Sequence, residues 1–234
     1  IVKHQPKIII IMERKRRNHT KRIVNLIIVD ESGSMSLIKK QALMGLNETL
    51  DTVKRMQEKE PNAHQYVTSL TFTSDNTHYV CDTTPAKRTH TIRPNDYQPS
   101  GCTPLYDAIG RGVSKVNAQT STDDVVLVTI ITDGEENSST EFDLRMVKQL
   151  IEKMKTLKWT FTFIGTDNLD VERMAHEMAI DNHLEFKQDE EGTRRMFEVE
   201  RNARMRFNSR IVHDAEPTCC GYFDDLDDKD TPSK

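Results

Sequence analysis

Short oxygen-bearing side chains cluster at three places in this sequence. Asp30, Ser32 and Ser34 alternate in "DESGS", directly after a long aliphatic run. Thr103 lies in "SGCTP" before a stretch of helical spacing, and Asp133 begins "DGEEN" after a second aliphatic run. In an extended loop, the alternation would turn Asp30, Ser32 and Ser34 toward one side. Hydroxyl and carboxylate oxygens, without sulfur or imidazole, suit Mg²⁺, or Mn²⁺ and Ca²⁺, and do not suit zinc or copper.

These clusters can act together only if secondary-structure elements bring them to one place, and the hydrophobic pattern predicts such elements. Uninterrupted aliphatic runs indicate strands buried on both faces, whereas apolar residues at three- and four-residue steps indicate helices. Two shorter runs around "TSDN" predict a hairpin at a sheet edge. Strands are predicted at 22–30, 65–72, 77–83, 124–132, 159–166 and 183–187, and helices after residue 37, after Pro104, around 144–154, at 169–180 and at 190–209.

The alternation of strands and helices predicts an α/β fold: a doubly wound, mostly parallel sheet with one antiparallel edge strand and helices on both faces. In such a sheet, ligands bind in the crevice beyond the carboxyl ends of the central strands. The three polar clusters all fall at that rim. The sequence therefore predicts a divalent-cation site formed by Asp30, Ser32, Ser34, Thr103 and Asp133.

In their order and context, the clusters resemble the metal-ion-dependent adhesion site of von Willebrand factor type A domains. "DESGS" matches the D-x-S-x-S element of that site, "SGCTPLYDAI" its threonine and "ITDGEEN" its aspartate. The resemblance covers roughly residues 22–188. It implies that Ser32, Ser34 and Thr103 would bind the cation directly, and that Asp30 and Asp133 would act largely through bound water.

Direct ligands that are neutral hydroxyls leave a cation poorly neutralised, so an open coordination position attracts an outside carboxylate. The resemblance therefore implies a protein-binding module that captures a Glu or Asp of a partner protein. The sequence shows no secretion signal and no membrane span, and in this it is similar to the stand-alone intracellular bacterial members of the family. A cytoplasmic adaptor is the function that this similarity implies.

Composition bounds the remaining possibilities. A chain of 234 residues with 35% hydrophobic and 30% charged residues suits one domain. We expect a basic extension at 1–21, the domain at 22–210 and an acidic, disordered tail at 211–234. The net charge of -4 gives no reason to expect binding to nucleic acid or to a membrane surface. The cysteines lack zinc-site or disulfide spacing, which favours a reducing compartment.

Two other interpretations of the clusters stay open. Asp30 and Ser32 on their own could cap the helix predicted after residue 37, and Thr103 could cap the helix that Pro104 begins. Doubly wound folds also include Mg²⁺-dependent phosphatases, which form an aspartyl-phosphate. These enzymes need a second carboxylate two residues after the first, where this chain has Ser32, and the sequence has no phosphate-binding glycine motif. A non-enzymatic function is therefore expected.

Three further acidic residues lie near the clusters. Asp107 is expected to be a first-turn acid that the helix dipole favours. Glu135 and Glu136 either tune the charge of the cation site or belong to a solvated loop.

Overall fold

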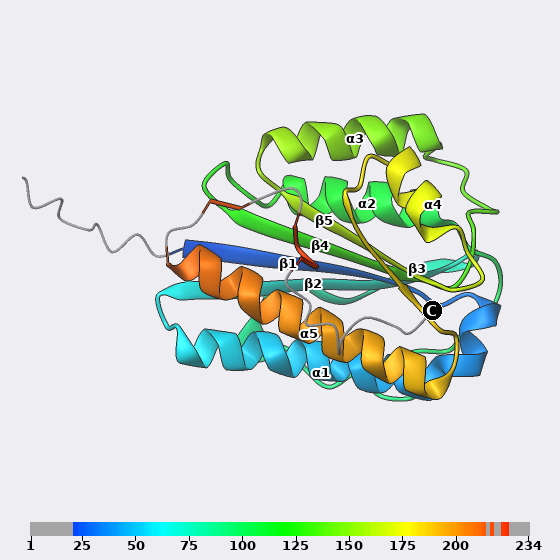
Figure 1. The fold of residues 1–234 in the computed structure, drawn as a ribbon, viewed down its shortest axis with the longest axis horizontal. Helices are drawn as coiled ribbons and strands as arrows, with labels where there is room; N and C mark the ends of the chain where they lie inside the picture. Colours follow the sequence, from blue (N-terminus) through cyan, green and yellow to red (C-terminus); the bar gives the residue numbers. More distant parts are fainter. Residues whose placement is uncertain (1–20, 214–215, 218–220, 225–234) are drawn as a thin grey trace, which may run out of the picture.

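The computed structural model describes residues 21–213, 216–217 and 221–224. Within them the chain forms a six-stranded sheet in the order β3-β2-β1-β4-β5-β6 (Figure 1). Every neighbouring pair is parallel except β2 and β3, which form an antiparallel hairpin at one edge. The predicted fold class is thereby confirmed. The strands are β1 (Lys21–Asp30), β2 (Ala63–Thr73), β3 (Asn76–Pro85), β4 (Val125–Thr132), β5 (Thr160–Thr166) and β6 (Asn182–Phe186).

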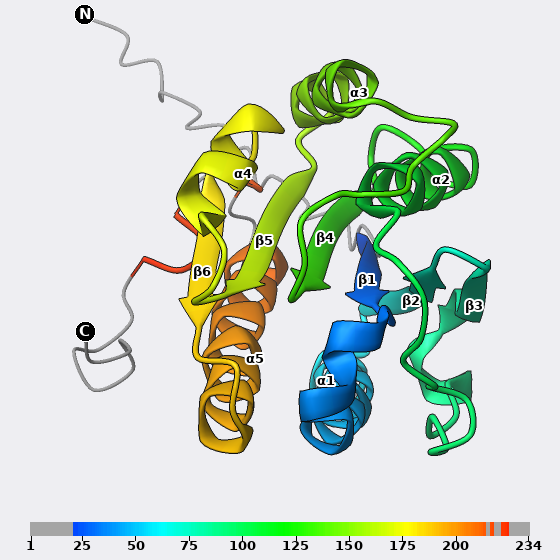
Figure 2. The same cartoon turned by 90° about the vertical axis from the view of Figure 1, so that its right-hand side faces the viewer.

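Helices cover both faces of the sheet, as Figures 1 and 2 show. Two long helices pack on one face and three shorter ones on the other, with an apolar cluster under each set. The first set is α1 (Lys39–Lys59) and α5 (Glu190–Val212), and the second is α2 (Leu105–Asn117), α3 (Leu144–Thr156) and α4 (Val171–Glu177). Short 3₁₀ turns, η1 (Gly33–Ile38) and η2 (Ala86–Arg88), lie before α1 and after β3.

The central strand β1 shows why its sequence is continuously aliphatic. Leu26 and Ile28 belong to the cluster under α2, α3 and α4, whereas Ile27 and Val29 belong to the cluster under α1 and α5. Successive side chains of a strand point to opposite faces, so a strand covered on both faces has no position for a solvated residue. All four side chains are at most 1% exposed.

Helix α5 is tied to the sheet by a buried polar network as well as by apolar packing. Arg204, which is 1% exposed, donates to Asn25 Oδ1 of β1 at 2.6 Å and to Thr129 Oγ1 of β4 at 2.8 Å. Its guanidinium also pairs with Glu200 one helical turn earlier, at 2.6 Å. The Tyr222 hydroxyl donates to the same Glu200 oxygen at 3.1 Å. This network joins the last helix to both central strands.

The ends of the chain differ from the expected domain bounds. The first strand begins at Lys21 and α5 continues to Val212, so both expected boundaries fall inside secondary structure. Tyr222 lies in the segment expected to be a disordered tail, yet it is 5% exposed and packs against Phe207. The remainder of the basic extension, Cys219 and Cys220, and residues 225–234 lie outside the described residues.

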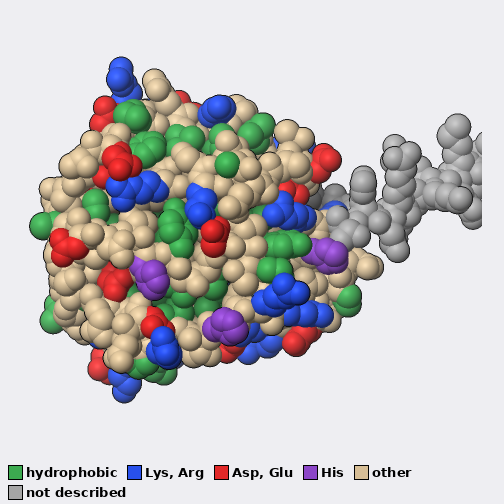
Figure 3. Space-filling model, turned by 180° about the vertical axis from the view of Figure 1, so that it is seen from behind, with side chains coloured by type: hydrophobic (Ala, Val, Ile, Leu, Met, Phe, Trp, Pro, Cys, Tyr) green, Lys and Arg blue, Asp and Glu red, His purple; other side chains and the backbone are tan. Residues whose placement is uncertain are grey.

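Two further features of the described part of the chain concern its helices and its surface. None of its helices has the length and apolar character needed to cross a bilayer. Figure 3 shows the face seen from behind, where Lys and Arg side chains are interspersed with Asp and Glu.

Candidate metal centre

The predicted site lies where the winding of the sheet reverses. From β1 the chain moves outward to β2 on one side and later returns to β4 on the other side of β1. The carboxyl ends of β1 and β4 thus lie next to each other with their connections leading in opposite directions (Figure 2). Such a switch point opens a crevice in doubly wound sheets. Asp30 ends β1, and Asp133 directly follows β4.

Four of the five predicted residues form a continuous chain of hydrogen bonds. Asp30 Oδ1 accepts a hydrogen bond from the Ser32 amide at 2.7 Å. The hydroxyl oxygens of Ser32 and Ser34 are 3.1 Å apart. The Ser34 hydroxyl then donates to Asp133 Oδ1 at 2.7 Å, which joins the loop after β1 to the loop after β4.

Thr103, the fifth predicted residue, reaches the same place from the loop before α2. Gly134 directly follows Asp133, and a Cβ atom at Gly134 would lie 2.9 Å from Thr103 Oγ1. The threonine hydroxyl therefore occupies the space that the glycine leaves open. The Thr103 amide donates to Asn137 Oδ1 at 2.8 Å, and its carbonyl oxygen accepts from the Asn137 amide at 3.1 Å. Thr103 does not cap α2 with its side chain, because the N-cap of that helix is Pro104 and no side-chain cap is formed.

The loop that carries Thr103 is held against the first cluster by its backbone. The Gly33 amide donates to the Gly101 carbonyl at 3.1 Å, and the Ser100 amide donates to the Glu31 carbonyl at 2.9 Å. Gly101 has φ +68°, and a Cβ there would lie 2.4 Å from Ser74 Oγ. Only glycine suits that conformation and that close approach. The loop therefore adopts at Gly101 a conformation that a residue with a side chain would strain.

Three side chains that the sequence did not single out support the predicted set. The Thr132 hydroxyl donates to Asp30 Oδ2 at 2.6 Å, and Gln188 Nε2 donates to Asp133 Oδ2 at 2.6 Å. The Tyr97 hydroxyl donates to the Asp30 carbonyl oxygen at 2.7 Å. A positional signal was available for two of them, because Thr132 directly precedes Asp133 and Gln188 follows the last predicted strand at the same rim.

Glu136 stabilises the loop after β4 by accepting backbone hydrogen bonds. Its carboxylate accepts from the amides of Ser138 and Ser139, at 2.8 and 2.7 Å, and from the amide of Tyr106 in α2 at 2.9 Å. Glu135 instead forms an exposed ion pair with Arg173 of α4 at 3.0 Å. Glu136 is therefore part of the scaffold, and neither of the earlier interpretations describes it.

Asp107, in the first turn of α2, stabilises the same loop in the same way. It is 3% exposed and accepts the backbone amides of Thr140, Glu141 and Phe142 at 2.8 to 2.9 Å. Burial raises the pKa of Asp107, but the three amide donors outweigh burial and hold the pKa below its usual value. The helix-dipole interpretation accounts for its place in the first turn but not for these three bonds.

Asp107→Asn is expected to destabilise the domain by about 1.5–3 kcal/mol at neutral pH, because the amide replaces an ionised acceptor of three backbone donors. A depressed pKa in the folded state gives stability that is present above the unfolded pKa and is lost as the pH falls through the folded pKa. The difference from the parent should therefore shrink in acid. Urea unfolding at neutral pH and below the usual pKa of aspartate measures it, with the exposed Asp51→Asn as control; an equal difference at both pH values would contradict the assignment.

Burial sets the electrostatics of the two predicted aspartates. Asp30 is fully buried and Asp133 is 2% exposed. Burial raises the pKa of Asp30 to about 6, against hydrogen bonds from Thr132 and Ser32 that lower it, and burial likewise raises the pKa of Asp133. Among the described residues, no Lys or Arg contributes to either shift. The two carboxylates therefore lie close together, and no Lys or Arg among the described residues offsets their charge.

The donor set fits a hard divalent cation. Among the described residues, no group of three or more His, Cys, Asp or Glu side chains could hold a metal ion. Zinc and copper sites built from imidazole or thiolate are therefore not formed there. A cation between the β1 and β4 loops would meet serine and threonine hydroxyls together with carboxylate oxygens, which are ligands of Mg²⁺, Mn²⁺ and Ca²⁺.

Comparison with known proteins gave no match to a family model or to a curated protein, but it did identify similar solved structures. The SpRpn10 VWA domain superposes with a TM-score of 0.58 at 11% sequence identity, over 76% of this chain and 94% of that one. The vWF domain of the type V pili tip protein Mfa5 from Porphyromonas gingivalis gives 0.55 at 9% identity, over 76% and 95%. The chain has a von Willebrand factor A-like fold.

Other similar solved structures are longer proteins. The PilB minor pilin from Streptococcus sanguinis superposes with a TM-score of 0.53 at 13% identity over 83% of this chain. This chain spans only 62% of the pilin's length. At such identities, the likeness establishes the fold and leaves the function to the site itself.

Proposed function

We propose that this von Willebrand factor A-like domain is a metal-dependent protein-binding module. Ser32, Ser34 and Thr103 would bind a divalent cation, with Mg²⁺ as the first candidate, and Asp30 and Asp133 would hold its water ligands. When bound, the cation would supply an open coordination position for a Glu or Asp of a partner protein. The observation that carries the proposal is the continuous chain of hydrogen bonds from Asp30 to Asp133, around two buried carboxylates whose charge no Lys or Arg in the described part of the chain offsets.

The distribution of charge in this set explains why a carboxylate is the expected partner group. Hydroxyl ligands carry no formal charge, so a cation that they bind keeps most of its attraction for an additional anion. The two aspartates offer two charges at most, and each already accepts hydrogen bonds from neighbouring side chains. Asp30 and Asp133 would therefore attract the cation to the crevice, and the hydroxyls would leave it receptive to a partner.

The surface beside the crevice suits a protein partner. Leu37 lies in η1, three residues after Ser34, and it is 76% exposed. Exposed single apolar side chains are common, but one beside a polar site can contribute the apolar part of an interface. A partner would thus combine an acidic residue with an apolar neighbour. The proposed setting is that of a cytoplasmic adaptor, which rests on the sequence resemblance.

An aspartyl-phosphate enzyme is not favoured by any contact at the site. Ser32 stands where such a phosphatase needs its second carboxylate. No lysine among the described residues contributes to the pKa shift of Asp30. We therefore propose no enzymatic activity. Turnover of a phosphomonoester with Mg²⁺, lost on Asp30→Asn, would reverse this conclusion.

Thr103→Ala is expected to reduce Mn²⁺ affinity about tenfold or more while lowering stability by less than about 1 kcal/mol. The substitution removes the hydroxyl and the γ-methyl group, and it leaves the backbone bonds of Thr103 to Asn137 in place because they do not involve the side chain. Thr103→Ser is the matched control, because it keeps the hydroxyl. Titration calorimetry with Mn²⁺ measures the affinity and thermal unfolding measures the stability.

The same variants test partner capture. The immobilised parent and Thr103→Ser should retain proteins from a cell lysate in Mg²⁺ and release them with chelator, whereas Thr103→Ala should not. Mass spectrometry then identifies what is released. Equal Mn²⁺ affinity in all three proteins, or capture that is indifferent to chelator, would show that Thr103 has no part in metal-dependent binding.

A further inference from the structure

The loop between β6 and α5 reaches the predicted site through the side chain of Gln188. Gln188 Nε2 donates to Asp133 Oδ2 at 2.6 Å, and the Ser34 hydroxyl donates to Asp133 Oδ1 at 2.7 Å. The two oxygens of this carboxylate thus accept from two different loops, one after β1 and one before α5. The last torsion of an aspartate side chain is broadly distributed unless neighbouring groups hold it. Together the two bonds therefore fix the plane of the Asp133 carboxylate.

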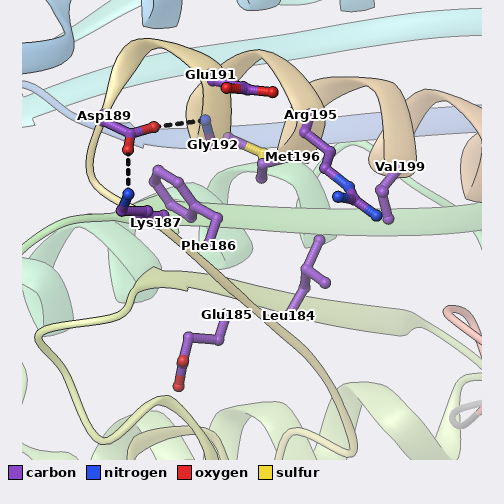
Figure 4. Close-up of a pocket in the computed structure, with 10 residues that line it drawn as sticks. All are labelled: Leu184, Glu185, Phe186, Lys187, Asp189, Glu191, Gly192, Arg195, Met196 and Val199. Atoms are coloured by element: carbon purple, nitrogen blue, oxygen red, sulfur yellow. Dashed lines mark hydrogen bonds and ion pairs between the residues drawn. The ribbon is translucent and has the colours of Figure 1, made fainter. Parts of the chain in front are cut away.

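The backbone around Gln188 is fixed on both sides, so the side chain starts from a defined place. The Gln188 amide donates to Asp167 Oδ1, in the loop after β5, at 3.2 Å. The next residue, Asp189, is the N-cap of α5. Its carboxylate accepts the Gly192 amide at 2.7 Å and pairs with Lys187 at 2.9 Å (Figure 4). Gln188 is therefore anchored between the loop after β5 and the first turn of α5.

The side-chain amide of Gln188 supplies a donor that carries no charge. A Lys or Arg in this position would offset the charge of Asp133 and repel a cation. A Glu would be ionised at neutral pH and could only accept hydrogen bonds, so it would leave Asp133 without a donor. A glutamine orients the carboxylate and preserves its attraction for a cation.

The orientation of Asp133 determines where the proton of the Ser34 hydroxyl points. A serine hydroxyl has one proton and two lone pairs. Because Asp133 Oδ1 takes the proton, the Ser34 oxygen keeps its lone pairs for other groups. Ser32 Oγ, 3.1 Å from Ser34 Oγ, is the alternative acceptor for that proton if Asp133 turns away. A turned carboxylate would therefore redirect the Ser34 lone pairs.

We propose that Gln188 is a positioning residue of the cation site, which acts through Asp133 on Ser34. This role rests on the proposed function, in which Ser34 binds the cation directly. Gln188 holds the Asp133 carboxylate, the carboxylate holds the Ser34 proton, and the Ser34 oxygen then presents a lone pair to the cation. The loop before α5 thereby contributes to cation binding through a residue that does not contact the cation.

Gln188→Met removes the donor and nearly keeps the length of the side chain. It is expected to lower Mn²⁺ affinity about tenfold or more, as is typical when a partner that orients a metal ligand is lost. Gln188→Asn, whose amide is one methylene group shorter, should act in the same direction. Titration calorimetry measures the affinity, and thermal unfolding in chelator verifies that each variant is folded.

Gln98→Met is the matched control. It makes the same substitution in the loop that leads to Thr103, where the Gln98 side chain bonds to the Pro94 carbonyl and to Lys39. The control should bind Mn²⁺ with the affinity of the parent. Parent affinity in both Gln188 variants as well, or an equal loss in Gln98→Met, would overturn the positioning role.

Carbon-13 NMR in chelator tests the hydrogen-bonded relay without a cation. Gln188→Met should shift the resonances of Asp133 Cγ and Ser34 Cβ and leave that of Asp30 Cγ in place, which a general loosening of the fold would not do. Unshifted Asp133 and Ser34 resonances would overturn the role, whatever the affinity. Failure of the parent to bind Mn²⁺ would instead overturn the proposed function, and the role of Gln188 in cation binding with it.

Discussion

Asp30→Asn is expected to stabilise the metal-free protein by about 1–3 kcal/mol at neutral pH and to remove its stabilisation by Mg²⁺. Folding buries the Asp30 carboxylate completely and raises its pKa to about 6, so ionised Asp30 opposes folding when no cation is present. The opposition grows as the pH rises from the unfolded pKa through the folded one. Asparagine has the same shape without the charge.

The neighbouring groups can accommodate the amide. Asparagine Oδ1 can accept the Ser32 amide as the carboxylate does. The Thr132 hydroxyl lies 3.0 Å from the Gly134 carbonyl oxygen as well as 2.6 Å from Asp30, so its proton can turn to Gly134. The hydroxyl oxygen is then able to accept a hydrogen bond from the asparagine amide.

Thermal unfolding with chelator and with millimolar Mg²⁺ measures both parts of this prediction. The parent should melt higher in Mg²⁺, because a ligand that binds only the folded state stabilises it. Asp30→Asn should melt higher than the parent in chelator and show no further rise with Mg²⁺. Asp123→Asn, at an exposed position, should behave as the parent; an Mg²⁺ response that survives in Asp30→Asn would exclude Asp30 from the cation site.

Glu200→Ala is expected to destabilise the domain by about 3–5 kcal/mol, the largest effect that we predict for one substitution. It leaves the Arg204 guanidinium, which is 1% exposed, without its counter-charge and removes the acceptor of the Tyr222 hydroxyl. The uncompensated buried cation causes most of the loss. The double variant Glu200→Leu with Arg204→Met should recover part of the stability, because no buried charge then remains.

Urea unfolding of Glu200→Leu, Arg204→Met, the double variant and the parent measures this coupling as a double-mutant cycle. Glu200→Ala is unfolded in the same way. The exposed pair of Arg194 and Glu198, 3.7 Å apart on the same helix, gives the control. Glu198→Ala should cost less than about 1 kcal/mol, because solvent screens an exposed pair. A loss in Glu200→Ala no larger than this control would mean that the buried ion pair of Glu200 with Arg204 does not stabilise the domain.

The fold was predictable because its signals are local. The aliphatic run before Asp30 is buried on both faces of a parallel sheet, and the hairpin around "TSDN" follows from alternation and turn residues. The grouping of Asp30, Ser34 and Asp133 was also predictable, since parallel strands place their carboxyl ends at one rim. Whether these residues bind a cation remains a prediction.

The supporting contacts were not predictable in the same way. Tyr97 reaches the Asp30 carbonyl across 67 residues of sequence, and Asp107 accepts amides 33 to 35 residues away. Such partners depend on how irregular loops approach each other, for which the sequence has no periodic signal. Tyr222 was missed for another reason: the acidic residues around it indicated solvation, whereas its ring packs against Phe207 and its hydroxyl donates to Glu200.

The hydrogen bond between Arg204 and Asn25 has a consequence for how the molecule folds. The two residues are 179 positions apart, yet the contact lies at the centre of the sheet. Asn25 therefore stays without this partner during synthesis until nearly the whole domain has left the ribosome. Contacts of such sequence separation slow folding, since a long loop must close before the contact can form. We expect β1 and β4 to pair early with incomplete order, and native stability to arise in a late step when α5 docks.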